Sequence, residues 1–272
     1  MSLKGRLLYL LACLDIVLIA LSFAMGFSTE VCFVTRAAHS ETSAYSWYTM
    51  PRTDGLQPDA QPEFSFISDY DGYWIGSSDD KVIYITFDAG YENGNMAPIL
   101  DALKKHNAPA AFFLVGHYIK SSPELVRRMM EEGHLVCSHS DNHKDMSAMT
   151  DFETFQKEMT GLEDTSRSVT GKEIEKYFRP PEGKFSETCL RYTQKLGYKT
   201  VFWSFAYKDW YVDNQPSAQS AMDTIISRTH PGMVALLHAT SSTNAAIMDD
   251  LLTEWEKMGY RFESLDHLTR NR

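Results

Sequence analysis

The stretch 82-VIYITFDAGYENG-94 decides the fold. Residues 82–87 are all β-branched or aromatic, which is typical of a strand, and the run ends directly on the carboxylate of Asp88 before small and polar residues take over. In parallel α/β proteins the reactive groups gather at the carboxyl ends of the strands. The position of Asp88 at such an end makes it a candidate functional residue.

Downstream, short β-branched or aromatic runs alternate with longer stretches of helical period, such as 122-SPELVRRMMEEG-133 and 244-NAAIMDDLLTEWEKMG-259. Several helical stretches begin near Ser, Asp or Asn and end near Gly, as capped helices do. Repeated β–α–β order predicts an α/β fold with about seven parallel strands, either an open doubly wound sheet or an incomplete barrel. The predicted strands cover residues 82–87, 110–115, 134–138, 177–179, 200–203, 233–237 and 261–265.

Composition limits the classes of function. The chain has 272 residues, 43% of them hydrophobic, so it can bury a full core as one large or two small domains. Its net charge of −10 includes no basic cluster, which argues against nucleic acid as a partner. No GxGxxG or GKS/GKT loop follows a predicted strand, which argues against nucleotide binding. The four cysteines lack CxxC spacing, which favours buried structural thiols.

The N-terminus differs from the rest of the chain. Lys4 and Arg6 precede a nearly unbroken apolar run over residues 7–27, and about 20 such residues suffice to cross a bilayer as a helix. We predict that residues 1–27 form an uncleaved signal anchor, with the membrane as a partner and the bulk of the protein extracytoplasmic. A cleaved signal peptide and a secreted product remain the alternative, because Asp15 is costly within a membrane span.

Residues 28–80 are rich in Ser, Thr, Pro, Asp and Tyr. Within them, 51-PRTDGLQPDAQPE-63 is typical of an extended linker. The aromatic clusters 45-YSWY-48 and 69-DYDGYWIG-76 predict that parts of this segment pack on the main domain. We therefore expect residues 28–80 to be a linker and an N-terminal extension.

Polar side chains follow most of the predicted strands. Alone, an aspartate at a strand end is more often a helix cap, and histidines spaced by four are more often exposed or capping groups. Because the carboxyl ends of parallel strands meet at one rim, these side chains are expected to converge. They are Asp88, His139, His143, Arg179 and His238, together with Asp209 and Trp210 in the loop after the fifth strand.

At these positions the sequence resembles the NodB-type polysaccharide deacetylases. Five motifs of that family occur in the same order: 86-TFDAG-90, 139-HSDNH-143, 179-RPPEG-183, 208-KDW-210 and 236-LLHAT-240. Within the family the chain resembles the muramic acid de-N-acetylases that prepare spore-cortex peptidoglycan for δ-lactam formation. The resemblance implies a distorted (β/α) barrel lacking one strand, residues 81–272 as the catalytic domain, and peptidoglycan as the partner.

The resemblance also implies roles in hydrolysing an N-acetyl amide, a reaction that needs an activated water and a proton for the departing amine. Asp88 resembles the general base and His238 the general acid. Arg179 resembles the arginine that keeps the base ionised, and Asp209 the carboxylate that keeps the acid protonated. The groups that resemble the family's pocket-lining residues are Trp210 and Pro181.

The same resemblance implies a divalent metal, zinc above all. His139 and His143 are four residues apart, so in a helical turn their imidazoles face the same side and can bind one ion. Most of the family completes the site with a second aspartate, where this chain has Ala89. We therefore expect an incomplete triad that holds its metal weakly and exchangeably, with solvent, substrate or Glu92 in the vacant position.

Two other functions remain open. An N-acetylglucosamine or chitin deacetylase would share the five motifs, although Ala89 and the following YENG weigh against it. A non-catalytic glycan-binding barrel is the second alternative. It would not need to retain Asp88, Arg179, Asp209 and His238.

Overall fold

The computed structural model describes residues 41–270. The predicted hydrophobic segment 1–27, with Cys13 and Asp15, lies outside the described residues, as does Cys32. Within residues 41–270 no helix has the length and apolar character needed to cross a bilayer. Cys137 and Cys189 are both free and buried, as the sequence predicted.

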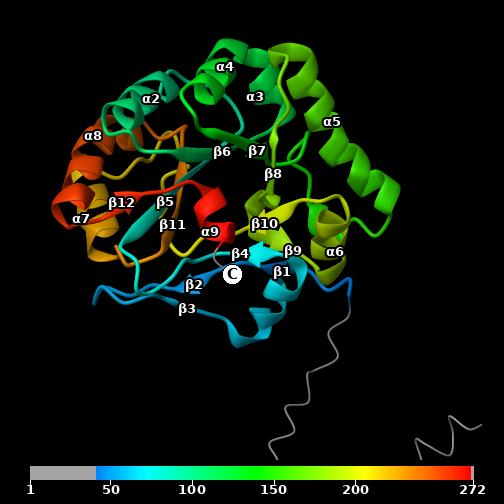
Figure 1. The fold of residues 1–272 in the computed structure, drawn as a ribbon, viewed down its shortest axis with the longest axis horizontal. Helices are drawn as coiled ribbons and strands as arrows, with labels where there is room; N and C mark the ends of the chain where they lie inside the picture. Colours follow the sequence, from blue (N-terminus) through cyan, green and yellow to red (C-terminus); the bar gives the residue numbers. More distant parts are fainter. Residues whose placement is uncertain (1–40, 271–272) are drawn as a thin grey trace, which may run out of the picture. The chain divides into compact units, whose positions relative to one another are not determined.

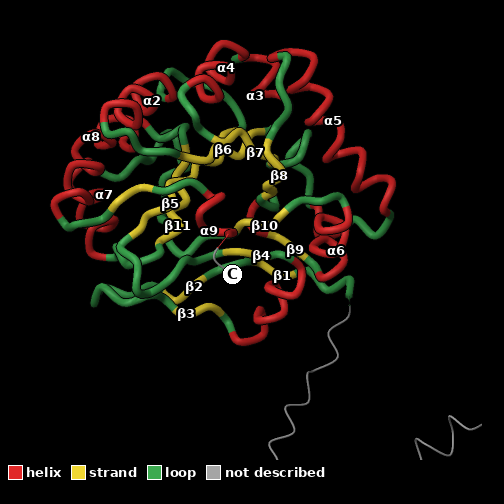
Figure 2. The backbone as a smooth tube through the Cα atoms, viewed as in Figure 1, coloured by secondary structure: helices red, strands yellow, loops and turns green. Residues whose placement is uncertain are grey.

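The centre of the fold is a parallel sheet that curves into an incomplete barrel (Figures 1 and 2). The strand order is β11-β5-β6-β7-β8-β10-β4, and β12 pairs with β5. All seven predicted strands are present: β5 Val82–Ala89, β6 Ala110–Leu114, β7 Leu135–Ser138, β8 Glu175–Phe178, β10 Lys199–Val201, β11 Met233–His238 and β12 Arg261–Phe262. Of the two sheets considered from the sequence, the incomplete barrel is the correct one.

Two strand boundaries matter for function. β5 was expected to end at Phe87, but its pairing continues, with Asp88 opposite both Phe113 and His238 and Ala89 opposite Leu114. β4, Gly72–Tyr73, pairs with β10, so the N-terminal extension itself supplies a strand of the sheet. Asp88 is therefore held inside a ladder between two neighbouring strands.

Helices surround the outer face of the sheet (Figure 1). The long ones match the predicted helical stretches and are capped as expected: Asp151 accepts a hydrogen bond from Thr154 N at the start of α5, and Gly171 ends it with a φ of 75°. The helices are α2 Met96–Lys105, α3 Gly116–Ser121, α4 Pro123–Glu131, α5 Phe152–Thr170, α6 Glu187–Lys195, α7 Ala218–Ser227, α8 Ser242–Lys257 and α9 Leu265–Arg270.

Alternation along β5 separates two cores, because successive side chains of a strand point to opposite faces. Ile83, Ile85 and Phe87 pack in the large core between the sheet and the outer helices. Val82 and Tyr84 pack inside the curve of the sheet, together with residues of α9. The inward face continues to Asp88, so the carboxylate emerges at the carboxyl end of the interior.

The rest of the N-terminal extension packs near the opening of the barrel, where the two end strands of the sheet, β4 and β11, do not pair with each other. The indole of Trp47 donates to the carbonyl of Trp203 at 2.8 Å, and the hydroxyl of Thr49 donates to the carbonyl of Ser204 at 3.3 Å. Packing of the extension, predicted from its aromatic clusters, is thus observed. Its elements are β1 Tyr45–Ser46, which pairs with β9 Lys184–Phe185, β2 Thr49–Met50, β3 Asp59–Ala60 and the 3₁₀ helix η1 Pro62–Tyr70.

Candidate active site

Asp88 and Arg179 form a buried ion pair at the carboxyl end of the sheet interior. Arg179 follows β8 directly, is fully buried, and donates from Nη1 to Asp88 Oδ1 at 2.8 Å. Its other nitrogens donate to Thr86 Oγ1 and to the carbonyl oxygens of Val201 and Phe202. Because four of its five N–H groups donate to fixed acceptors, the guanidinium is held in place and fixes the carboxylate in turn.

The charge of Asp88 is set by two opposing effects. Burial raises the pKa of this carboxyl, but the positive charge of Arg179 and the hydrogen bond that it donates, together with the charge of His238, outweigh burial and leave the pKa below its ordinary value. One oxygen, Oδ1, is bound by Arg179, whereas Oδ2 lies 3.5 Å from His139 Nε2. Asp88 is therefore an ionised carboxylate with one oxygen left for a ligand or a proton.

His238 ends β11 directly beside Asp88 and binds a second carboxylate. Its Nδ1 donates to Asp209 Oδ1 at 2.7 Å, and its backbone N–H donates to Asp209 Oδ2 at 2.7 Å. Burial lowers the pKa of His238, but the charge and hydrogen bond of Asp209 outweigh burial and raise it. The imidazole is thus stabilised in its protonated form, with Nε2 as the ring nitrogen not held by Asp209.

Asp209 is held by a residue that the sequence did not single out. Asn244, in the first turn of α8, donates from Nδ2 to Asp209 Oδ2 at 2.7 Å and accepts from the hydroxyl of Tyr207. Asp209 is fully buried and Asn244 nearly so. The second carboxylate is therefore oriented by three donors, two from His238 and one from Asn244.

His139 follows β7 and is buried beside Asp88. Its Nδ1 lies 2.8 Å from the carbonyl oxygen of Arg179, an acceptor only, so Nδ1 carries the proton and Nε2 carries a lone pair. Burial is the main reason why the pKa of His139 falls to about 4, so the ring is neutral at neutral pH. Nε2 then points a lone pair at the carboxylate of Asp88 with no proton between them, an arrangement that suits a bound cation.

His143 brings a second imidazole to the same place. Its ring centroid lies 4.9 Å from that of His139, and its side chain is exposed. The two imidazoles form a donor set that suits a divalent metal such as zinc. The Nδ1–H of His139 donates to a backbone carbonyl, as metal-binding histidines commonly do. His139 and His143 therefore fit the expected ion, although within residues 41–270 no cluster of three or more His, Cys, Asp or Glu is arranged to hold one.

Ala89 and Glu92 supply no further ligand here. Ala89 is buried on the same face of β5 as Phe87, in the large core between the sheet and the helices. Glu92 accepts a hydrogen bond from the buried hydroxyl of Tyr118 at 2.8 Å and another from the backbone N–H of Gly94. Both oxygens of Glu92 are thus engaged by other groups, which argues against Glu92 among the alternatives for the vacant position.

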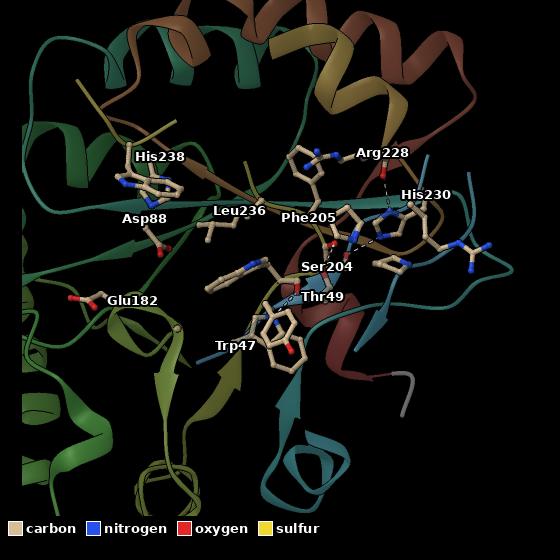
Figure 3. A pocket seen from close by; sticks show the side chains of 18 of the residues that line it. Trp47, Thr49, Asp88, Glu182, Ser204, Phe205, Arg228, His230, Leu236 and His238 are labelled. Carbon is tan, nitrogen blue, oxygen red and sulfur yellow. Dashed lines mark hydrogen bonds between the residues drawn. The ribbon is translucent and has the colours of Figure 1, made fainter. Parts of the chain in front are cut away.

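Asp88, His139, His143 and His238 line one cavity of about 700 Å³ (Figure 3). Asp88 and His238 lie next to each other at one end, and the wall continues through Trp203 and Phe205 to Trp47 and Thr49 of the extension. Trp210 also lines it, 43% exposed, with its ring 5.7 Å from that of His238. The cavity thus combines apolar walls with a few converging polar groups, as small-molecule sites do.

Pro181 differs from its prediction. It is buried and does not line the cavity, whereas Glu182 and Gly183 of the same motif do. The reason is the short 3₁₀ turn η3, Pro181–Gly183, in which Glu182 adopts a φ of 58° and the chain reverses. The proline is therefore buried within the turn and outside the lining of the cavity.

The chain is similar to several known proteins. Residues 75–201 match the family model described as polysaccharide deacetylase. The chain is 43% identical over 212 residues to the peptidoglycan-N-acetylmuramic acid deacetylase PdaA of Bacillus subtilis, which covers 78% of this chain and 80% of PdaA. The solved structure of PdaA, a family 4 carbohydrate esterase, superposes with a TM-score of 0.81 and 41% identity over 84% of this chain and 97% of that one.

Two further relatives show the range of the similarity. A family 4 carbohydrate esterase from Bacillus anthracis superposes with a TM-score of 0.70 and 36% identity, covering 85% of this chain and 98% of that one. A chitooligosaccharide deacetylase from Rhizobium leguminosarum bv. trifolii is 34% identical over 161 residues, or 59% of this chain and 73% of that protein. The similarity to PdaA extends over more of the chain than the similarity to the rhizobial protein.

Proposed function

Because the chain belongs to the polysaccharide deacetylase family, we propose that it hydrolyses the N-acetyl group of muramic acid residues in peptidoglycan. One observation carries the proposal: Asp88 and His238 are direct neighbours across two strands, and their pKa values are displaced in opposite directions. A carboxylate that stays ionised beside an imidazole that stays protonated is a base and acid pair for amide hydrolysis. The similarity to PdaA over most of both chains supports muramic acid as the sugar.

In the proposed reaction, water adds to the acetyl carbon and the carbon–nitrogen bond breaks, which gives acetate and a free amine on the sugar. Asp88 takes the proton of the attacking water. Its Oδ1 is bound by Arg179, so Oδ2 is the oxygen that accepts the proton. A general base in this position typically contributes about 10²- to 10⁴-fold to the rate.

His238 gives its proton to the departing nitrogen. Asp209 binds Nδ1, so the transferable proton is the one on Nε2. Loss of an amine without a proton is unfavourable, and a histidine with a raised pKa still carries that proton at neutral pH. Asp209 keeps the imidazole charged before the transfer and oriented during it.

Deacetylases of this family are generally metal-dependent. We propose that His139 and His143 hold a divalent ion, zinc being the expected one. When bound, such an ion polarises the acetyl carbonyl and stabilises negative charge on its oxygen. With two protein ligands the ion is expected to exchange readily, so dialysis against a mild chelator should remove it together with activity. A stoichiometric zinc retained after that dialysis would contradict the two-ligand site.

Mass analysis of muropeptides tests the substrate. Purified peptidoglycan is incubated with the enzyme and then digested, and the expected product has lost acetyl groups from muramic acid only. Acetyl loss from glucosamine would instead support the alternative function, and no loss on any sugar would support a glycan-binding barrel. We propose that this deacetylation lies on the way to muramic δ-lactam in spore cortex; where the lactyl carboxyl carries no stem peptide, its condensation with the new amine appears in the same spectra as a further loss of water.

The location of the protein needs a separate experiment. We propose that residues 1–27 anchor the enzyme in the membrane with residues 41–270 outside the cytoplasm, where peptidoglycan lies. Membrane fractions treated with an external protease should lose the catalytic domain, and the anchored protein should keep its N-terminal sequence. A soluble secreted form that lacks residues 1–27 would support a cleaved signal peptide instead.

A further inference from the structure

The loop that carries His143 is held in an unfavourable backbone conformation. His143 has a φ of 54°, and Ser140, three residues earlier, has a φ of 65°. Residues other than glycine adopt such angles at a cost, so the conformation persists only where surrounding contacts determine it. For residues 141–144, which we call the histidine loop, these contacts come from α5 on one side and from the start of α3 on the other.

Glu158 of α5 supplies most of these contacts. Its carboxylate accepts the backbone N–H of Asn142 at 3.0 Å and the side-chain N–H₂ of Asn142 at 3.2 Å, and it forms an ion pair with Lys144 Nζ at 2.6 Å. Its backbone carbonyl accepts the N–H of Asp141 at 3.1 Å. One residue therefore holds the chain immediately before and immediately after His143.

Two glycines allow the loop to approach this closely. A Cβ on Gly116 would lie 1.9 Å from Asp141 Oδ1, and a Cβ on Gly161 would lie 3.3 Å from Asp141 Oδ2. Gly116 also donates its backbone N–H to the carbonyl of Asp141 at 2.9 Å. Gly161 is in the interior of α5, where glycine costs about 1 kcal/mol relative to alanine, so the close contact explains a residue that helix stability disfavours.

Glu158 is not required for the packing of its own helix. Only 5% of it is exposed, and its buried neighbours Phe155, Met159 and Leu162 already supply the apolar face of α5. A buried carboxylate is costly unless it is paired and hydrogen-bonded, and among residues 41–270 the carboxylate of Glu158 has its hydrogen bonds and its ion pair with the histidine loop. The free-energy cost of burying the Glu158 carboxylate is therefore offset by its contacts with this loop.

We infer that Glu158 is a positioning residue that sets His143 opposite His139 for metal binding. The inference rests on the proposed metal site and adds a specific residue to it. Glu158 touches neither imidazole and acts through the Asn142 backbone and Lys144. Residues that orient metal ligands in this way typically account for about 10- to 100-fold in metal affinity.

The test is a zinc titration of metal-stripped protein by calorimetry, with wild type, Glu158→Ala and Glu158→Gln in parallel. Glu158→Ala should weaken zinc binding by about 10- to 100-fold. Glu158→Gln keeps an oxygen for the Asn142 N–H and loses the ion pair with the exposed Lys144, so it should stay within about fivefold of wild type. Hydrogen exchange of the metal-free proteins should show faster exchange at the Asn142 amide in Glu158→Ala alone.

Glu163→Ala is the matched control. Glu163 lies on the same helix, pairs with Lys176 and accepts from the hydroxyl of Tyr198 at 2.6 Å, but it has no contact with the histidine loop. Its loss should lower the melting temperature and leave zinc affinity unchanged. If Glu158→Ala does not fold, Gly116→Ala disturbs the same loop from α3 and should weaken zinc binding at least about tenfold.

The outcomes distinguish the role of Glu158 from the existence of the metal site. Wild-type zinc affinity in Glu158→Ala or in a folded Gly116→Ala, or an equal loss in Glu163→Ala, would overturn the role of Glu158 while leaving the metal site intact. A wild-type protein that binds no zinc would overturn the metal site and, with it, the role of Glu158. Muropeptide analysis would still decide the deacetylase function independently.

Discussion

The two histidines beside Asp88 differ in protonation state: His139 is neutral and His238 is protonated. His139 lies 3.5 Å from the carboxylate and has a pKa lowered to about 4, whereas the pKa of His238, the neighbour of Asp88 on β11, is raised. Burial pushes both pKa values down, and the charge of Asp88 pushes both up. Neither effect can explain the difference.

The two pKa values differ because Nδ1 has a different hydrogen-bond partner in each histidine. In His139 this nitrogen faces the carbonyl oxygen of Arg179, which fixes the tautomer but adds little stabilisation to a charged ring. In His238 it faces the carboxylate of Asp209, which fixes the tautomer and stabilises the charge. A neutral acceptor therefore prepares an imidazole to bind a metal, and a charged acceptor prepares it to donate a proton.

The largest expected effect on kcat comes from replacing Asp88, the carboxylate that lies next to both histidines. Asp88→Asn keeps the shape of the side chain but can no longer accept a proton from water, so kcat should fall by about 10³-fold or more. Acetate release from peptidoglycan measures this, and circular dichroism checks that the fold is intact. Turnover at the wild-type rate would show that another group is the base.

Asp209→Asn should make His238 resemble His139. An amide oxygen can still accept from Nδ1 but no longer stabilises the charge, so burial would dominate and the pKa of His238 would fall. The acid form is fully present below that pKa and is lost as pH rises through it, so the alkaline limb of kcat should move to lower pH. At neutral pH the rate should fall by about 10²-fold. An unmoved alkaline limb would mean that another group donates the proton.

Asn244→Ala should have a smaller effect in the same direction. It removes one of three donors to Asp209, together with a hydrogen bond to the carbonyl of His238, but it leaves both hydrogen bonds from His238 to Asp209 in place. A hydrogen bond to a charged group is worth about 1.5–3 kcal/mol, so the protein should lose roughly that much stability, which chemical denaturation measures. We expect kcat to fall by less than in Asp209→Asn, and an equal fall in both variants would show that Asn244 acts on the acid by more than orientation.

The sequence predicted the sheet well because each strand carries its own pattern. β5 is a continuous β-branched or aromatic run up to Phe87 and β11 is a continuous apolar run up to His238, so the residues at their ends could be placed on one rim without knowing any contact. The two-residue β4 and the six-residue α3 were not predicted, because so few residues carry no periodicity. Their places are set by what they pack against.

The residues that hold the site in place were the ones the sequence did not reveal. Asn244 has the character of an ordinary polar residue near a helix start, and Glu158 that of an ordinary charge on a long amphipathic helix. Each becomes informative only through a partner far along the chain, 35 residues away for Asn244 and 16 for Glu158. Pro181 shows the reverse case, a motif residue that is buried and does not line the cavity.

A third buried histidine, far from catalysis, tests whether the partner of the ring decides its charge throughout the protein. His134 has no carboxylate partner among residues 41–270, its Nδ1 accepts the N–H of Ala110 at 3.2 Å, and burial is the main reason why its pKa falls from 6.5 to about 4. The unfolded chain takes up its proton first as pH falls, so the stability that His134 contributes is fully present above pH 6.5 and is lost as pH falls through about 4.

His134→Asn removes this titration, while the side-chain amide oxygen can still accept from Ala110. Over the window from pH 6.5 to about 4, wild type should lose up to about 3 kcal/mol of unfolding free energy through His134, and the variant should lose correspondingly less. Urea denaturation across this range measures the slope, and kcat at pH 7 should match wild type because His134 does not line the cavity. Identical slopes would mean that the buried ring is already charged in the folded protein, and that a neutral partner does not suffice to keep an imidazole neutral.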